Sequence, residues 1–321
     1  MRPSVAGVAA AAACVLLIAL PATAAAPRIK EFRVKTSSSR PITIARGPDG
    51  ALWFAEFSGN RIGRITTKGK VREFRVPTAD SSPGQVAAGP DGAIWFTEIG
   101  GNKIGRVTTK GKMKEFRVPT ASSGPTGLVR GRDGAMWFTE ATASKIGRIT
   151  TRGKVREFTI PTPGSIPEGI VSGPDGALWF AEGGPAKIGR ITTKGKIKEF
   201  SVPAPGGFPG GITAGPDKAL WFAEFTGNKI GRISTAGKVR TFSVPTSSSS
   251  PDQLVTGPDK AIWFTEQDAN KIGRITTKGK VREFAVPSAS SFPSGITSGP
   301  ESALWFTEQG TDKIGRLAAS R

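Results

Sequence analysis

Carboxylates are the side chains in this sequence whose regular spacing most clearly indicates a possible binding or catalytic site. A glutamate recurs every 42 residues, always three residues after a tryptophan. The seven copies are Glu56, Glu98, Glu140, Glu182, Glu224, Glu266 and Glu308. Carboxylates on one level could hold a divalent cation or a cationic ligand, and each would raise the pKa of its neighbours. Alternatively each glutamate accepts backbone amides or pairs with a basic neighbour in its own repeat, and its presence in all seven copies favours this structural role.

Positions that differ between the copies are better candidates for a binding site, because one ligand needs only some of them. Fourteen residues before each glutamate, directly after a proline, stand Ile42, Gly84, Thr126, Glu168, Gly210, Asp252 and Ser294. Its acidic members predict two carboxylate pairs, Glu168 with Glu182 and Asp252 with Glu266. Further irregular polar positions on these segments are Arg46, Gln85, Arg130 and Gln253. Together these groups could bind a polar ligand, and ordinary surface variation explains them equally well.

Composition excludes several kinds of chemistry. The sequence has no histidine and no tyrosine, which rules out imidazole and phenol as acids, bases or metal ligands. Residues 1–24 have the layout of a secretory signal peptide, with an apolar run too short to span a bilayer and an Ala22-Thr23-Ala24 cleavage sequence. Cys14, the only cysteine, lies inside this segment. We therefore expect a secreted, periplasmic or cell-envelope protein with no membrane span, thiol or disulfide.

The elements that must position these residues form an internal repeat. Seven tryptophans, from Trp53 to Trp305, are separated by 42 residues each. Turn sequences divide the first repeat into four short segments, at residues 43–46, 51–56, 61–66 and 71–76. Four such segments predict an antiparallel four-stranded blade. The whole chain is then an all-β, seven-bladed β-propeller that forms a single domain over residues 25–321.

The two ends of the chain predict how the ring closes. The last repeat stops at Leu317, after its third segment. The missing fourth segment has a match at residues 29–34, which read like residues 71–76 of the first repeat. We therefore expect the N-terminal strand to complete the last blade, so that no long sheet edge stays open.

The net charge of +20 is concentrated on the outer half of each repeat. In the first repeat the basic residues are Arg61, Arg64, Lys68, Lys70, Arg72 and Arg75. They predict a belt around the circumference, which either protects outer strands from edge-to-edge aggregation or binds an anionic polymer such as a cell-wall polyanion, an acidic glycan or extracellular nucleic acid. Sequence-specific reading of nucleic acid is not expected, because no aromatic residues for base stacking interleave with the belt.

The repeat resembles that of the virginiamycin B lyase (streptogramin lyase) family. Its halves read P-x-G-I-x-x-G-P-D-G-A-L-W-F-T-E and G-N-K-I-G-R-I-T-T-x-G-K, as residues 294–307 and 101–111 illustrate. The likeness covers residues 29–317, nearly the whole mature chain. It implies the seven-bladed fold and an activity, the linearisation of cyclic streptogramin B antibiotics by elimination at the ester linkage, with Mg²⁺ and a histidine base.

The family's site corresponds to four positions here. Its histidine base corresponds to Ser294, and the acidic residue two places earlier to Phe292. A second, substrate-contacting histidine corresponds to Asp252, and the strand-end glutamate is retained as Glu308. Glu308, with Glu266 one repeat earlier, is the candidate ligand for Mg²⁺. A serine cannot act as a base near neutral pH without a partner.

Two functions from different classes follow. The first is a secreted, lyase-like propeller that binds a small molecule or an anionic polymer, as a monomer and without the family's histidine-dependent catalysis. The second is a magnesium-dependent carbon–oxygen lyase of streptogramin B type whose base is a carboxylate such as Asp252 or Glu308. A purely structural scaffold is a third possibility, because a fold alone does not fix a function.

Overall fold

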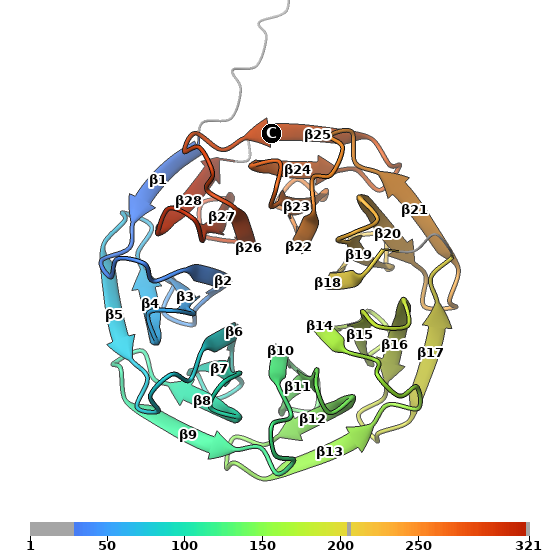
Figure 1. Ribbon diagram of the computed structural model, residues 1–321, viewed down its shortest axis with the longest axis horizontal. Coiled ribbons are helices and arrows are strands. Elements are labelled where there is room, and N and C mark those ends of the chain that lie inside the picture. Colours follow the sequence, from blue (N-terminus) through green and yellow to red (C-terminus); the bar gives the residue numbers. More distant parts are fainter. Residues whose placement is uncertain (1–28, 204–206, 319–321) are drawn as a thin grey trace, which may run out of the picture.

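Seven four-stranded antiparallel sheets are arranged as blades around a central axis in the computed structural model, which describes residues 29–203 and 207–318 (Figure 1). Within each blade the strands run in order from the axis to the rim. The predicted all-β, seven-bladed propeller is therefore confirmed. The predicted signal peptide at residues 1–24 lies outside the described residues, which contain no helix long and apolar enough to cross a membrane.

The inner two strands of each blade line the axis and carry the buried aromatic residues. The innermost strands are β2 (Pro41–Arg46), β6 (Pro83–Ala88), β10 (Pro125–Arg130), β14 (Pro167–Ser172), β18 (Pro209–Ala214), β22 (Pro251–Thr256) and β26 (Pro293–Ser298). The second strands are β3 (Leu52–Glu56), β7 (Ile94–Glu98), β11 (Met136–Glu140), β15 (Leu178–Glu182), β19 (Leu220–Glu224), β23 (Ile262–Glu266) and β27 (Ala303–Glu308).

The outer two strands carry most of the basic residues. The third strands are β4 (Arg61–Ile65), β8 (Lys103–Val107), β12 (Lys145–Ile149), β16 (Lys187–Ile191), β20 (Lys229–Ile233), β24 (Lys271–Ile275) and β28 (Lys313–Ala318). The outermost strands are β5 (Val71–Arg75), β9 (Met113–Arg117), β13 (Val155–Thr159), β17 (Ile197–Ser201), β21 (Val239–Ser243), β25 (Val281–Ala285) and β1 (Ile29–Arg33).

The innermost strands begin two residues earlier than the sequence predicted. β2 starts at Pro41, and its pairing with β3 shifts register between Pro41 and Thr43. Comparable shifts occur in the other six blades. The variable column that begins with Ile42 therefore lies within the strands, at a β-bulge that redirects its side chains.

The hydrophobic core lies between the blades. Trp53 and Phe54 on β3 point to opposite faces of their blade, and both are fully buried. The Trp53 ring stacks on Phe74 of the same blade at a centroid distance of 5.5 Å, while Phe54 packs against Gly63, where there is no room for a Cβ atom. The other six blades repeat the tryptophan–phenylalanine stacking at 5.3–5.6 Å.

The N-terminal strand closes the ring, as the sequence predicted. β1 pairs antiparallel with β28, so that Ile29 lies opposite Leu317, and the two lie side by side in Figure 1. Phe32 stacks on Trp305 at 5.6 Å. Glu31 accepts a hydrogen bond from the Lys313 ammonium group at 3.0 Å. The last blade therefore has the same stacked pair as the others.

A side chain after the second strand joins consecutive blades. Asn60 accepts hydrogen bonds from the Ser81 amide at 3.2 Å and from its hydroxyl at 2.7 Å. At the seam, where the last blade meets the first, the equivalent residue is Asp312. It accepts hydrogen bonds from the Ser38 amide at 2.6 Å, the Ser39 hydroxyl at 3.2 Å and a further backbone amide at 3.0 Å. A carboxylate only accepts hydrogen bonds, so one charge holds three donors at the point of closure.

Removal of β1 tests the closure. A chain that begins at Thr36 should unfold at a lower temperature than one that begins at Pro27, because β28 loses its partner and Trp305 loses Phe32. Losing a buried aromatic contact costs about 3–5 kcal/mol, which corresponds to a drop of roughly 5–8 °C for a domain of this size. Differential scanning calorimetry would measure the midpoints, and a synthetic peptide of residues 27–35 should restore part of the loss. Equal midpoints would contradict the closure.

Candidate ligand site at the mouth of the channel

The seven glutamates that end the second strands lie inside the blades and do not line the axis. All seven side chains are fully buried. Glu98 lies opposite Lys103 of the third strand in the register, and its carboxyl group approaches Glu115 of the outermost strand. The structure therefore supports the structural role for this column, with a carboxyl group of the outer strand as the main partner.

The two carboxyl groups of such a pair titrate in opposite directions. Burial, and then the charge of Glu115, raises the pKa of Glu98 to about 8. Burial also acts on Glu115, yet hydrogen bonds from Lys103 and Thr78 hold its pKa below the usual value. With its pKa raised to about 8, Glu98 carries a proton at neutral pH, and apart from the neighbouring Glu115 carboxylate its buried carboxyl oxygens have no hydrogen-bond partner among the described residues. Comparable pairs are Glu140–Glu157, Glu182–Glu199, Glu266–Glu283 and Glu308–Glu31.

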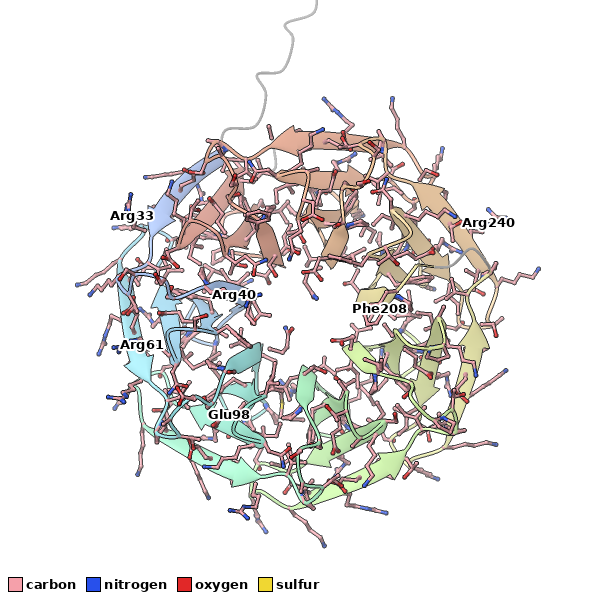
Figure 2. The ribbon with its side chains drawn as sticks, viewed as in Figure 1. Arg33, Arg40, Arg61, Glu98, Phe208 and Arg240 are labelled. Atoms are coloured by element: carbon pink, nitrogen blue, oxygen red, sulfur yellow. The ribbon has the colours of Figure 1, made fainter. Side chains whose placement is uncertain are left out.

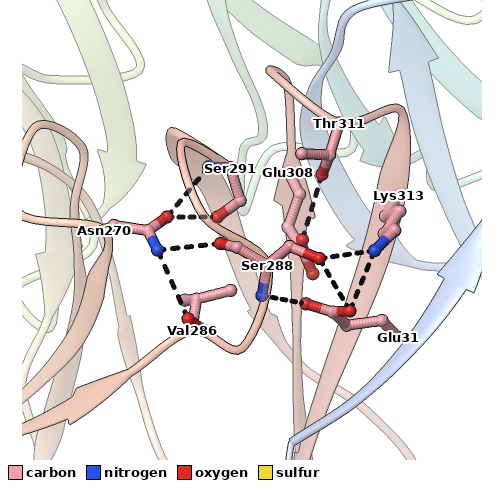
Figure 3. Close-up of polar contacts among 8 residues, drawn as sticks. All are labelled: Glu31, Asn270, Val286, Ser288, Ser291, Glu308, Thr311 and Lys313. Atoms are coloured by element: carbon pink, nitrogen blue, oxygen red, sulfur yellow. Dashed lines mark hydrogen bonds and ion pairs between the residues drawn. The ribbon is translucent and has the colours of Figure 1, made fainter.

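Figure 3 shows the equivalent residues of the closing blade, Glu308 and Glu31, with the hydrogen bonds that each forms to its other neighbours. Burial raises the pKa of Glu308 to about 8, and the Thr311 hydroxyl donates to its Oε2 at 3.2 Å. Glu31 accepts from the Lys313 ammonium and from the Ser288 amide, each at 3.0 Å. The proton-sharing pair therefore ties β27 and β28 to β1 and to the loop of the preceding blade.

The candidate metal ligands do not converge. Glu266 and Glu308 belong to neighbouring blades, and each is engaged with the outer-strand glutamate of its own blade. Within residues 29–203 and 207–318, no three acidic side chains come close enough to hold a metal ion. Mg²⁺ requires octahedral oxygen ligands, yet Phe292 supplies none and the Ser294 hydroxyl donates to Asp252. The residues at the four family positions therefore do not fit a Mg²⁺ site.

The variable column surrounds the mouth of the central channel. A cavity of about 260 Å³ there is lined by its members Ile42, Thr126, Glu168 and Ser294, together with glutamine side chains. A second cavity of about 180 Å³ lies further along the innermost strands and is lined largely by their aliphatic residues. The deeper cavity also presents mainly polar surface and includes Gln85 and Gln253, so the channel stays polar below its mouth.

A third cavity, of about 290 Å³, opens beside the mouth over the blade that begins with β18. Its walls are Glu168, Phe208, Gly210, Phe225 and Asp252, with Gln253. No atom lies near the position that a Cβ of Gly210 would occupy, so the missing side chain leaves space between the two acidic residues. Figure 2 shows Phe208 at the inner edge of the ring.

The structure pairs Glu168 with Asp252 and not with the glutamate of its own blade. Burial, and then the charge of Asp252, raises the pKa of Glu168 to about 7. Burial raises the pKa of Asp252 to about 6, against hydrogen bonds from Ser294 at 3.2 Å and Gln253 at 3.3 Å. The sequence missed this pair because Glu168 and Asp252 belong to blades two apart in the ring, and only Gly210 stands between them.

The predicted pairs of Glu168 with Glu182 and of Asp252 with Glu266 do not form. The strand pairing places Pro167, and not Glu168, opposite Glu182. The carboxyl groups of Glu182 and Glu266 turn into their blades, toward outer-strand glutamates, because the second strand presents them to the blade face. Neither lines the cavities at the mouth.

The two predicted arginines lie at the other end of the channel. Arg46 and Arg130 are the last residues of β2 and β10, and both are exposed. The column that begins with Ile42 is four residues away, which is roughly 13 Å along an extended strand. These arginines therefore do not belong to the acidic site at the mouth.

Two exposed apolar side chains mark the rim of the mouth. Ile166 and Phe292 each precede the proline of an innermost strand and are 40% and 41% exposed. Their φ angles of 45° and 47° lie in the left-handed region, which costs about 1–3 kcal/mol for such residues. The same left-handed conformation recurs at this position in other blades, as at Arg40 and Ser250, so it belongs to the repeat, and only the exposed apolar side chain is particular to these two residues.

The sequence departs most from the repeat beside the cavity that Glu168 and Asp252 line. Ala186 occupies the position of Asn60, whose side chain joins consecutive blades. Gly207 occupies the position of the buried serine to which that asparagine binds. The Gly207 amide donates instead to Glu224 at 3.0 Å. Thr241 replaces the outer-strand glutamate that would otherwise share the proton of Glu224. These departures from the repeat were readable in the sequence and are the signal that could have located the site.

Comparison with known proteins identifies the family. The profile of the virginiamycin B lyase family matches residues 20–206 and 162–321. The chain belongs to this family. Virginiamycin B lyase from Staphylococcus aureus is 41% identical, with a TM-score of 0.88 over 92% of this chain and 100% of that one.

Two further structures place the fold more widely. A catalytically inactive variant of the Staphylococcus aureus lyase, with one histidine replaced by alanine and with quinupristin, is 40% identical, with a TM-score of 0.88 over 92% of this chain and 100% of that one. Hydrazine synthase from Kuenenia stuttgartiensis is 15% identical, with a TM-score of 0.75 over 89% of this chain and 97% of that one. This last likeness concerns the fold alone.

The buried glutamates predict how stability depends on pH. Because the folded-state pKa of Glu98 is about 8 and its ordinary value is 4.5, the folded protein retains a proton that the unfolded chain releases. The free energy of unfolding should therefore fall as the pH rises from about 5 to 8, by up to about 1.4 kcal/mol per pH unit for each such group.

In the Glu98→Gln variant, the free energy of unfolding should fall less as the pH rises, since an amide can donate to Glu115 without ionising. Chemical denaturation at pH 5 and pH 9 should show the variant gaining stability relative to the parent only at the higher pH. The matched control is Glu224→Gln, whose carboxylate already has a backbone donor and which should gain less. Parallel pH profiles for the parent and Glu98→Gln would show that Glu98 is ionised in the folded protein.

Proposed function

We propose that this propeller binds a small organic cation with an apolar part at the mouth of its channel, without the histidine-dependent elimination of its family. The observation that carries the proposal is the cavity of about 290 Å³ bounded by Glu168, Asp252, Phe208 and Phe225. Carboxylates and aromatic rings together are the usual partners of an ammonium or guanidinium group that bears a hydrophobic substituent.

Charge favours a cation at this place. Glu168 and Asp252 repel each other, and neither forms an ion pair within the described residues. A cationic group between them would relieve this repulsion and favour ionisation of both carboxyls. The exposed rim residues Ile166 and Phe292 do not line this cavity, so the apolar contacts come from Phe208 and Phe225.

The absence of histidine argues against the family's elimination. A Staphylococcus aureus relative with one histidine replaced by alanine is catalytically inactive, and this chain has no histidine at all. The Ser294 hydroxyl donates to Asp252 at 3.2 Å, and a carboxyl with a pKa of about 6 is far too weak a base to deprotonate a serine.

A second candidate function is elimination with Asp252 as the base. This carboxyl occupies the position that matches the family's substrate-contacting histidine, and burial raises its pKa to about 6. A general base works best when its pKa lies near the operating pH. The contact between Asp252 and Ser294 also places it beside the position that matches the family's catalytic histidine.

We also propose that the protein acts outside the cytoplasm, as a monomer. The proposal rests on the sequence of residues 1–24, which has the order of features typical of a secretory signal peptide. A propeller closed by its own N-terminal strand needs no second copy to complete a sheet.

Binding of 2-phenylethylammonium tests the first candidate. Isothermal titration at pH 8 should show binding of this amine and at least about tenfold weaker binding of neutral 2-phenylethanol. Affinity should fall between pH 8 and pH 5, because protonation of Glu168 and Asp252, with pKa values of about 7 and 6, removes the attracting charge. The variants Glu168→Gln and Asp252→Asn should each lose about tenfold, while Glu301→Gln, at an exposed position, should bind as the parent does. Equal binding of amine and alcohol would contradict a cationic ligand.

A turnover assay separates the two candidates. With Mg²⁺ present, the purified protein should open the streptogramin B ring at a negligible rate compared with a histidine-containing relative, and titration with MgCl₂ should show no tight site. Ser294→His combined with Phe292→Glu should restore only a trace of activity, since the second histidine is still missing. Robust turnover by the parent that is abolished by Asp252→Asn or by Glu308→Gln would establish the carboxylate-base lyase instead.

A further inference from the structure

The positive charge on the outer wall is uneven. Three consecutive outermost strands, β1, β5 and β9, each present two exposed cations, and the other four strands present one each. The paired cations are Lys30 and Arg33, Arg72 and Arg75, and Lys114 and Arg117. At the position of the second cation the other strands have Thr159, Ser201, Ser243 and Ala285. Among the outermost strands, the positive charge is therefore densest on β1, β5 and β9.

The charges of the three extra arginines are not neutralised by the protein. Arg33, Arg75 and Arg117 are exposed, and none forms an ion pair with a carboxylate in the described part of the chain. The acidic residue two places earlier on each strand is already engaged. Glu73, for example, accepts from the Lys35 amide at 2.7 Å and from the Thr36 hydroxyl at 2.8 Å.

The three strands form one continuous stretch of the rim. β1, β5 and β9 follow each other along the outer edge of the ring (Figure 1), and Arg33 points outward from that edge in Figure 2. A convex edge with regularly repeated cations suits an extended chain that follows the curve. It suits a flat membrane surface less well, because a plane touches a convex wall over only part of its length.

The wall has the composition of a site that binds by charge. The large apolar side chains that are exposed in the described residues are Ile166 and Phe292, and both lie at the channel mouth. A protein partner would need an apolar centre to its interface, which this wall lacks. Phe32 and Phe116 are stacked on tryptophans on one side and covered by Lys30 and Lys114 on the other, at 5.1 and 4.7 Å, so they offer no open ring to a nucleic-acid base.

We propose that the wall formed by β1, β5 and β9 binds a linear polymer with repeated phosphate groups and no bases. The planar fork of an arginine binds two phosphate oxygens at once, and the remaining oxygens of the same group can accept from a neighbouring ammonium. The surface is separate from the channel mouth, so the polymer would hold the protein in place while the mouth stays accessible.

Binding to long-chain inorganic polyphosphate tests the proposal. Fluorescence anisotropy at a series of salt concentrations would compare the parent with the triple variant Arg33→Ser, Arg75→Ser and Arg117→Ser, which copies the residues that other blades have at this position. The dissociation constant of the triple variant should rise about tenfold or more. The slope of log K against log salt should decrease in magnitude by about 2–3, because each phosphate contact that is lost means one fewer counterion released on binding.

The matched control removes the same charge from the opposite wall, with Arg156→Gln, Lys198→Gln and Arg240→Gln. It should change the dissociation constant less than about threefold. Equal losses in the two triple variants would overturn the proposal in favour of a uniform belt. Tighter binding of polyglutamate, single-stranded DNA or anionic vesicles than of polyphosphate would overturn the choice of phosphate polymer. Should the triple variant fail to fold in a thermal melt, Arg75→Ser alone should still weaken binding and lower the salt slope by about 1.

Discussion

Both faces of every blade are covered by the neighbouring blades, and this double burial governs what the chain can vary. Trp53 and Phe54 occupy opposite faces of one strand with no exposed surface, and their equivalents around the ring are at most 3% exposed. A change of side-chain volume at these positions would disturb the packing of two blades at once, since protein interiors are packed as densely as organic crystals. Variation is therefore left to the edges of the blades. Both proposed binding surfaces lie at such edges, one at the inner strand ends and one on the outermost strands.

The buried glutamates extend this constraint from packing to hydrogen bonding. An ionised carboxylate buried inside a blade would be costly, and the pairing of protonated Glu98 with ionised Glu115 reduces that cost to one charge, which Lys103 and Thr78 then satisfy. Because Thr78 belongs to the loop between β5 and β6 and Glu115 lies on β9, the same carboxylate also joins two consecutive blades. The family's glutamate at Glu308 thus has a structural partner in Glu31 that is independent of any reaction.

The fold was predictable from the sequence because a period of 42 residues, the turn sequences and the unmatched N-terminal segment leave one way to close the ring. The candidate site was predictable only in part. Asp252, Glu168 and Ser294 were found through their departure from the repeat, yet the sequence paired each acid with the glutamate of its own blade. The correct partner depends on the bulge at Pro41 and its equivalents, and on which face of a blade each strand end presents. Neither is encoded in spacing alone.

The seam has a further consequence, for how many chains share one ring. β1 has the same sequence pattern as every other outermost strand, so it could pair equally well with β28 of a second molecule. Domain swapping of β1 between two copies is therefore compatible with the strand pairing. The linker of residues 34–40 opposes that exchange. Seven residues extend to at most about 25 Å, which confines β1 close to its own β28 at an effective concentration on the order of millimolar. Asp312 then fastens that same linker through three donors, so that a short tether and one charge keep the ring in a single chain.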